Sequence, residues 1–297
     1  MAPRSSRRAF LGVAGLAATA GCTGLPGLGD REDPRDWLYA PAALGDWRLY
    51  GFRSVEPATV ADYRDRLPDA DPADLLERHL IGRARSLDLA PRDVEWVLRG
   101  SDPLFGHPSV AVVHGDLDAE RIRSAVEAIP SPAFRAAGVY RGFDRFESDR
   151  GAAGVDDGLL IWATGRASPV AVETAIPTGE GEVGRAQERT ATAEAMVERL
   201  FPATYVFVQM RADGDVRGEG FAQRVDGDRT EVLSTTVFAS AEAVPDAATA
   251  AETWYAEAAR ERVDDVSLDV DGAAVVGTGT MPTDGVSLGK WPFRPAD

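Results

Sequence analysis

Three Asp-Gly dipeptides, each between two runs of β-forming residues, are the feature that most constrains how this chain can fold. Asp-Gly is favoured in tight hairpin turns because the central residues of these turns need positive φ angles. The flanking runs are therefore predicted as antiparallel strands. The dipeptides are Asp213-Gly214, Asp226-Gly227 and Asp271-Gly272, and the flanking runs are 205–210, 216–225, 231–238, 263–270 and 273–280.

Segments with helical periodicity alternate with the predicted strands. In residues 109–163 and again in residues 231–280, a strand leads to a helix and then to a two-stranded hairpin. This repeated order predicts an α+β fold of duplicated β-α-β-β units of the ferredoxin-like kind, with antiparallel sheets and helices packed on one face. The predicted helices are 57–67, 72–87, 118–129, 168–176, 190–201 and 246–262, and the further predicted strands are 47–53, 92–98, 109–114, 139–146 and 159–163.

Composition along the chain predicts four parts. Residues 1–21 form a signal peptide, and residues 22–36, rich in Gly, Pro and charge, form a flexible tether. Residues 37–180 and 190–290 are the two α+β halves, separated by a polar, Gly-rich stretch at 177–190. Composition leaves open whether the halves pack as two domains or as one long sheet.

The N-terminus has the pattern of an export signal. Arg7 and Arg8 precede a short, weakly apolar run that is too short to span a bilayer. Residues 6–11, Ser-Arg-Arg-Ala-Phe-Leu, resemble the twin-arginine signal. Residues 19–22, Thr-Ala-Gly-Cys, resemble a lipobox, which implies that Cys22 is lipidated and becomes the new N-terminus. Two lipid chains would hold the mature protein at a membrane without a transmembrane helix.

The charge of the chain is strongly one-signed. It has 48 acidic and 32 basic residues, a formal net charge of −16, and Lys290 as its one lysine. Loss of residues 1–21, which contain three arginines, would bring the charge to −19. This charge disfavours nucleic acid as a partner and favours diffuse cation binding. Acid excess with few lysines resembles the proteins of salt-adapted archaea.

A wider resemblance also points to salt-adapted archaea. The stretch 110–118 (Val-Ala-Val-Val-His-Gly-Asp-Leu-Asp), a helix, Tyr140-Arg-Gly-Phe and an apolar strand from Leu159 follow one another in the chain. This order is similar to that of haloarchaeal lipoproteins exported by the twin-arginine route, a group of unassigned function. The resemblance implies a fold and an extracytoplasmic, membrane-anchored location, and it implies no activity or site residues.

Candidate chemistry in the sequence is sparse. His114 ends a predicted strand beside Asp116, and this pair is the first candidate for catalysis. His79 lies on an apolar helix face and is predicted to be a core residue, and Asp118 is predicted as a helix N-cap rather than a calcium ligand. No metal site is expected, because the chain has one cysteine and none of its three histidines lies in an H-E-x-x-H or H-x-H arrangement. No cofactor is expected, because the G-x-G-x-x-G match at 179–184 follows a helix instead of a strand.

The tryptophans are predicted mainly as core residues. Trp96, Trp162 and Trp254 lie at positions of regular strand or helix periodicity, whereas Trp291 lies near the C-terminus and is the best exposed candidate for a stacking platform.

The leading functional hypothesis is a lipid-anchored, extracytoplasmic binding or interaction module of unknown ligand, which is not an enzyme. One alternative is a surface hydrolase with a dispersed active site, in which His114 and Asp116 would act. Another is an accessory subunit of a membrane transport complex, with a membrane protein as its partner.

Overall fold

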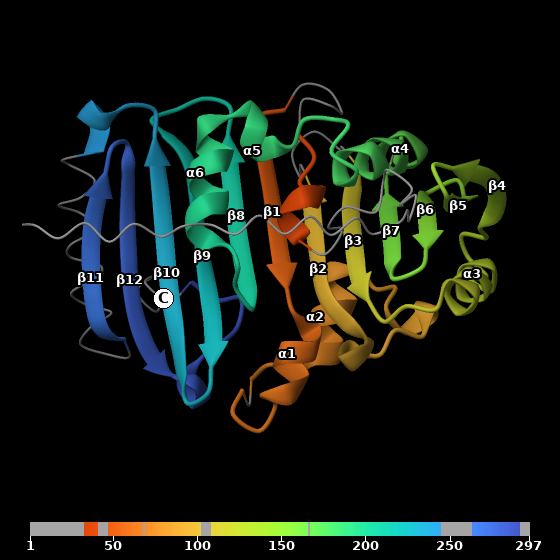
Figure 1. Ribbon diagram of the computed structural model, residues 1–297, viewed down its shortest axis with the longest axis horizontal. Coiled ribbons are helices and arrows are strands. Elements are labelled where there is room, and N and C mark those ends of the chain that lie inside the picture. Colours follow the sequence, from red (N-terminus) through yellow and green to blue (C-terminus); the bar gives the residue numbers. More distant parts are fainter. Residues whose placement is uncertain are drawn as a thin grey trace, which may run out of the picture.

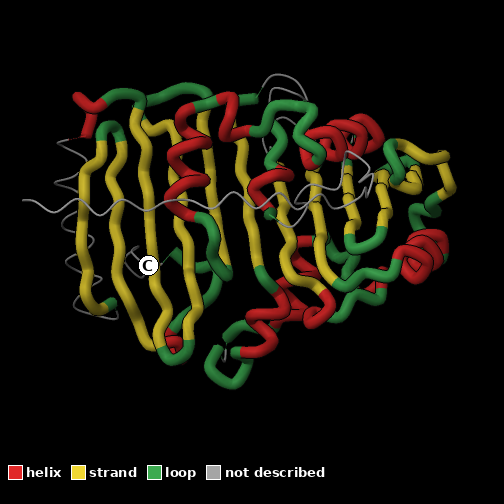
Figure 2. Tube along the Cα trace, in the orientation of Figure 1, coloured by secondary structure: helices red, strands yellow, loops and turns green. Residues whose placement is uncertain are grey.

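The computed structural model describes residues 33–40, 47–67, 69–101, 108–165, 167–244 and 263–291. Within these residues, twelve strands form one continuous sheet in the order β11-β12-β10-β9-β8-β1-β2-β3-β7-β6-β5-β4 (Figures 1 and 2). The strands are β1 (Leu49–Val55), β2 (Val94–Ser101), β3 (Ser109–Gly115), β4 (Arg135–Tyr140), β5 (Phe143–Glu147), β6 (Gly151–Asp156), β7 (Leu159–Thr164), β8 (Tyr205–Arg211), β9 (Val216–Asp226), β10 (Arg229–Phe238), β11 (Asp264–Asp271) and β12 (Ala274–Pro282).

The two parts of the chain enter the sheet in the same way. Strands β1, β2 and β3 form a meander, after which the chain crosses to the sheet edge at β4 and returns to pair β7 with β3. Strands β8, β9 and β10 form a second meander, and β12 returns from the opposite edge strand, β11, to pair with β10. At the centre, β1 pairs with β8 along its whole length. The two parts therefore share one uninterrupted sheet.

The predicted α+β fold class of duplicated ferredoxin-like units is wrong, because the described residues form one large antiparallel sheet that is mostly β. The strands do not close two small sheets, and helices cover both faces of the single sheet instead of one. After α3 (Ala119–Glu127) the chain passes to the far edge of the sheet, and a meander of four strands leads back to β3. Pairing β1 with β8 also satisfies backbone groups that two separate sheets would leave exposed at their edges.

Apolar side chains alternate along the strands and build one core on each face of the sheet. On one face, Val55, Val97 and Val113 pack with α1 (Pro57–Asp62), α2 (Pro72–His79) and α3. On the other face, Phe52, Leu98 and Val112 pack with α4 (Ser168–Gly179), α5 (Ala186–Arg189) and α6 (Ala191–Leu200). We call them the α2 face and the α6 face, and α6 lies on the side toward the viewer in Figure 1. Short 3-10 helices are η1 (Pro34–Trp37), η3 (Arg85–Leu87), η4 (Pro91–Asp93), η5 (Ala241–Ala243) and η6 (Thr283–Gly285).

Several local predictions are confirmed. Asp226 pairs with Arg229, and Asp271 pairs with Ala274, so two of the Asp-Gly dipeptides enter two-residue hairpin turns. The third dipeptide, Asp213-Gly214, lies within the longer loop between β8 and β9. Asp118 caps α3 by accepting a hydrogen bond from the backbone N–H of Arg121 at 2.7 Å, as expected for a carboxylate at a helix start.

Other elements differ from the prediction. The single strand predicted over 139–146 is a hairpin, because Arg141 and Gly142 have φ angles of 52° and 90° and reverse the chain. Strand β6 was not predicted, since its Gly- and Ala-rich sequence has little β propensity. The helix predicted over 72–87 ends at His79, because Ile81 and Gly82 have positive φ angles.

Of the tryptophans, Trp96 and Trp162 are buried, as predicted. Trp291 is half-buried against Phe207 and Phe221 rather than exposed. Trp254 and the helix predicted over 246–262 lie outside the described residues. Among the helices that are described, none is long and apolar enough to cross a bilayer.

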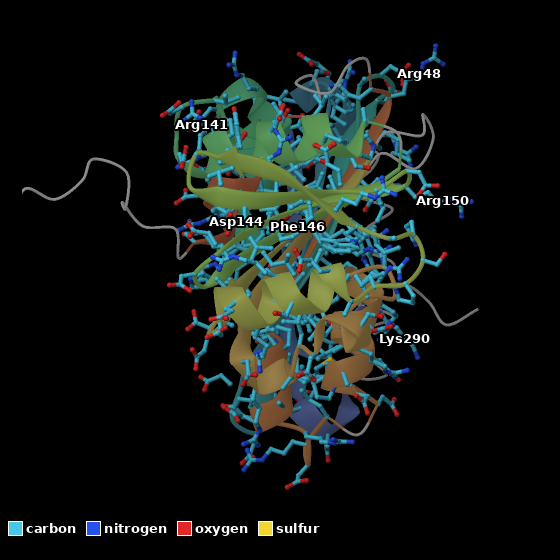
Figure 3. All side chains as sticks on the ribbon, turned by 90° about the vertical axis from the view of Figure 1, so that its right-hand side faces the viewer. Arg48, Arg141, Asp144, Phe146, Arg150 and Lys290 are labelled. Carbon is cyan, nitrogen blue, oxygen red and sulfur yellow. The ribbon has the colours of Figure 1, made fainter. Side chains whose placement is uncertain are left out.

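The two edges of the sheet differ in charge. Strand β11 carries Asp264, Asp265, Asp269 and Asp271, and a row of charges discourages pairing with another chain. The opposite edge, β4, carries no carboxylate and exposes 68% of Val139. Figure 3 shows the molecule from this second end, where Arg150 projects into solvent.

Candidate functional site

The candidate pair from the sequence, His114 and Asp116, is not joined by a hydrogen bond or ion pair in the described residues. The His114 ring stacks on Trp96, with centroids 5.3 Å apart. Its Nδ1 lies 3.1 Å from Glu95 Oε2 but is not aligned for a hydrogen bond. Asp116 is exposed, and its backbone N–H donates to the Asp93 carbonyl. His114 therefore faces Glu95 on the neighbouring strand β2.

The predicted export and lipidation residues, Arg7, Arg8 and Cys22, lie outside the described residues. Within the described residues, no group of three or more His, Cys, Asp or Glu side chains is placed to hold a metal ion.

Two arginines face each other at the centre of the sheet. The register of β1 and β2 pairs Arg53 with Arg99, so both side chains leave the same face of the sheet. Val55 and Val97, two residues away on each strand, belong to the core of the α2 face. The arginines therefore lie on the α2 face, in the same row of the sheet as the buried Ala111. Like charges directly opposite each other on paired strands destabilise a sheet, so the pair calls for an explanation.

Helix α2 brings a histidine and a third arginine to the same place. The helix begins at Pro72, capped by Asp71, whose carboxylate accepts from the backbone N–H of Ala73 at 2.8 Å. Its apolar face buries His79, as the sequence predicted. The carbonyl of Arg78 accepts a hydrogen bond from Arg99 Nη1 at 3.0 Å, which fixes the end of α2 above the arginine pair.

His79 is buried, and only one of its two ring nitrogens has a hydrogen-bond partner. Its Nδ1 lies 2.8 Å from the Leu75 carbonyl. Because a carbonyl only accepts, Nδ1 carries the proton of the neutral ring, and Nε2 is left as an acceptor. Nε2 is buried without a hydrogen-bond partner. The pKa of His79 is lowered to about 4, mainly by burial. The Leu75 hydrogen bond opposes this shift, and the charges of Arg53, Arg99 and Arg78 add to it.

The arginines of this cluster are held by neutral groups. Arg99 Nε donates to Ser109 Oγ at 2.9 Å, and the Arg53 guanidinium lies over the Phe207 ring, 5.1 Å from its centroid. Burial, and then the charge of Arg53, lowers the pKa of Arg99. In the described part of the chain, no carboxylate forms an ion pair with Arg53, Arg78 or Arg99. Their positive charge is therefore not compensated by any carboxylate of the described residues.

Two hollows share Arg53 and Arg99 in their linings. A cavity of about 90 Å³ is lined by Arg53, Leu75, Arg78, His79, Arg99, Tyr205, Leu288 and Gly289. A groove of about 260 Å³ is lined by Gly51, Phe52, Arg53, Arg99, Ser101, Phe207 and Gln209. Among the described residues, no carboxylate lines either hollow, although the chain as a whole has 16 more acidic than basic residues. We call them the arginine cavity and the Gly51 groove.

A larger cleft lies elsewhere and is acidic. Its volume is about 600 Å³, and its lining includes Asp33, Asp36, Glu56 and Trp96. Asp33 forms an ion pair with Arg35, and Asp36 forms one with Arg185 at 2.7 Å, so two of its three carboxylates are neutralised. Burial raises the pKa of Glu56, which favours its neutral form. This cleft therefore has less unmatched charge to offer a ligand than the arginine cavity, despite its size.

Sequence reasoning missed the arginine cavity. Arg53 and Arg99 are far apart in the chain, and only the register of β1 and β2 brings them together. A weak signal was available, because each arginine lies two residues from a buried valine on the same face of its strand. A charge at such a position departs from the usual alternation of a half-buried strand.

The stability of the protein should reveal the repulsion between the paired arginines. We expect Arg53→Gln to raise the free energy of unfolding by about 0.2–1 kcal/mol, since it removes one of two like charges on opposed residues. Denaturant titrations of the wild type and the variant, at one salt concentration, measure this change. Arg53 and Arg150 are both exposed, so Arg150→Gln, which removes an equal charge from outside the paired positions of β1 and β2, is the control and should change stability less. A loss of stability in Arg53→Gln would show that Arg53 has a structural role.

Comparison with known proteins gives little further information. No protein-family model matches the chain, and no curated protein matches it. Solved structures of TP0453 match the chain at 8% identity. Crystal form III has a TM-score of 0.48 and covers 85% of this chain and 95% of that chain. Crystal form IV has a TM-score of 0.47 and covers 84% and 96%. Likenesses of this degree carry no functional argument.

Proposed function

We propose that this chain is a lipid-anchored binding protein of the extracytoplasmic membrane surface, and that its ligand binds in the arginine cavity and the Gly51 groove. The observation that supports binding is the uncompensated charge of Arg53, Arg78 and Arg99 beside the unpartnered Nε2 of His79. The support for the location is the signal-like sequence around Arg7, Arg8 and Cys22.

A binding site explains an arrangement that is unfavourable for stability. Proteins keep destabilised groups where function needs them, and they compensate elsewhere in the fold. Here the pairing of β1 with β2 holds Arg53 opposite Arg99. A ligand of opposite charge would remove the repulsion between the arginines on binding. This relief would make the free energy of binding more favourable.

The anchor is tested by Cys22→Ser. This variant should move the protein from the membrane fraction to the soluble fraction of salt-washed cells, because the lipid chains supply the attachment. Its melting temperature should match that of the wild type, since residue 22 precedes the sheet. Membrane and soluble fractions are compared by immunoblotting, with a conservative serine variant, Ser6→Thr, as the control. Retention of Cys22→Ser in the membrane would rule out the lipid anchor.

Adaptation to high salt is part of the same proposal. Repulsion between surface carboxylates extends over about 10 Å at 0.1 M salt and about 3 Å at 1 M. We therefore expect the melting temperature to rise steadily from millimolar to molar KCl, with diffuse cation binding adding to the effect. Thermal unfolding followed by circular dichroism measures this trend. A melting temperature that stays flat or falls would leave the acidity as a feature of composition alone.

A further inference from the structure

The arginine cavity and the Gly51 groove together have features that define a class of ligand, and this step rests on the binding function proposed above. At about 90 Å³ the cavity is smaller than the usual 300–1,000 Å³ of a small-molecule site. It can therefore hold one functional group of a ligand, while the rest of the ligand occupies the adjoining groove of about 260 Å³.

The charges of the cavity select an oxyanion. Guanidinium groups from three elements, β1, α2 and β2, line it, and arginine pairs especially well with phosphate and carboxylate oxygens. Arg99 is held in place by Ser109 Oγ and the Arg78 carbonyl before any ligand arrives. A site whose donors are already oriented loses less entropy on binding.

His79 adds a second requirement. Its Nε2 is an unpartnered acceptor in the neutral ring, and its ring lines the cavity. Such an acceptor fits a hydroxyl group carried by the anion itself. Hydrogen phosphate and a singly protonated phosphomonoester offer both anionic oxygens and a P–OH group, whereas sulfate and a carboxylate at neutral pH offer no hydroxyl.

The groove next to the cavity suits a small organic body. Gln209, Gly51 and Ser101 lie in register across β8, β1 and β2, and Phe207, Arg53 and Arg99 form the next row on the same face. Gly51 leaves the floor of the groove without a side chain between two polar groups. Gln209 and Ser101 can bond hydroxyl groups, and the half-buried Phe207 ring can pack against carbon atoms.

We propose that the arginine cavity binds a protonated phosphate group, with its anionic oxygens on Arg53, Arg78 and Arg99 and its P–OH donating to His79 Nε2. The Gly51 groove binds the small hydroxyl-bearing body of the same molecule. The ligand class is thus a small phosphomonoester, either free or as the headgroup of a lipid.

Calorimetric titration of the full chain carrying Cys22→Ser tests this proposal. We would titrate it with inorganic phosphate, glycerol 3-phosphate and sulfate at pH 6 in 1 M KCl. Both phosphates should bind, and sulfate should bind at least ten-fold more weakly. Arg53→Gln should weaken phosphate binding at least ten-fold, whereas Arg150→Gln, with the same loss of charge, should leave it within two-fold.

A groove variant separates the two parts of the site. Gly51→Val fills the Gly51 groove without changing any charge, so it should weaken glycerol 3-phosphate at least five-fold and leave inorganic phosphate within two-fold. Circular dichroism and the melting temperature confirm that each variant is folded. Equal loss of both ligands in a folded Gly51→Val would contradict the division of the site into cavity and groove.

Vesicles distinguish the two sources of the phosphate group. Phosphatidylcholine vesicles containing phosphatidic acid present a phosphomonoester, and vesicles containing phosphatidylglycerol present a diester without P–OH. If the protein sediments only with vesicles that contain phosphatidic acid, and Arg53→Gln abolishes this, the ligand is a lipid headgroup. If the protein binds glycerol 3-phosphate but neither kind of vesicle, the ligand is a free phosphomonoester. Absence of binding in every arm, or phosphate binding unchanged in Arg53→Gln, would overturn the proposal. The membrane location is tested independently of ligand binding, by fractionation of Cys22→Ser.

Discussion

Trp162→Ala is expected to lower the free energy of unfolding by about 3–5 kcal/mol, the usual cost of removing a large aromatic side chain from a core. The Trp162 side chain is 1% exposed and lies in register between Ala111 on β3 and Ala153 on β6. These two small neighbours leave room for the indole, which also packs on Phe134 with centroids 4.9 Å apart. Alanine at position 162 would therefore leave a cavity that neither neighbour can fill.

Denaturant titration at one high salt concentration measures this loss. Val139→Ala on the exposed edge strand β4 is the matched control, because 68% of Val139 is accessible, and its effect should stay within about 0.5 kcal/mol. If Trp162→Ala cost no more than Val139→Ala, the core of the α2 face would not be packed as described.

Stability should also depend on the ionisation of His79. In the folded protein, burial lowers the pKa of His79 to about 4, against 6.5 for an unperturbed histidine. Between these values the unfolded chain binds a proton that the folded protein does not bind, so acidification favours unfolding. The stability that depends on keeping His79 neutral is fully present above pH 6.5 and is lost as the pH falls toward 4. The full loss is about 3 kcal/mol, at about 1.4 kcal/mol for each pH unit.

The test compares the wild type with His79→Gln at several pH values between 4 and 7. The groups that face His79 are Arg53, Arg78, Arg99 and Tyr205, and none of them changes ionisation over this range. The free-energy difference between the two proteins should therefore shift by about 3 kcal/mol in favour of the variant as the pH is lowered. Parallel pH profiles would show that His79 does not resist protonation in the folded protein.

Local chemistry predicted much of the secondary structure. The hairpins at Asp226-Gly227 and Asp271-Gly272 follow from the φ angles that glycine allows, and Asp118 caps its helix because a short carboxylate reaches nearby backbone N–H groups. Burial of His79 and Trp162 follows from apolar periodicity. Each of these features depends on residues close together in the chain, so a single sequence is enough to predict them.

Pairing between distant strands accounts for what the sequence did not predict. Strand β6 forms because β5 and β7 flank it and α4 packs closely over Gly154, although its own residues have little β propensity. The register of β1 with β2 opposes Arg53 and Arg99, and α2 then places His79 over them. A strand's pattern shows which face is buried but not which strand lies beside it, because hydrogen bonds between backbones are the same for every sequence. Individual strands and helices were therefore readable along the chain, whereas the predominance of strands, the single sheet, its two covered faces and the arginine cavity depend on contacts between segments far apart in it.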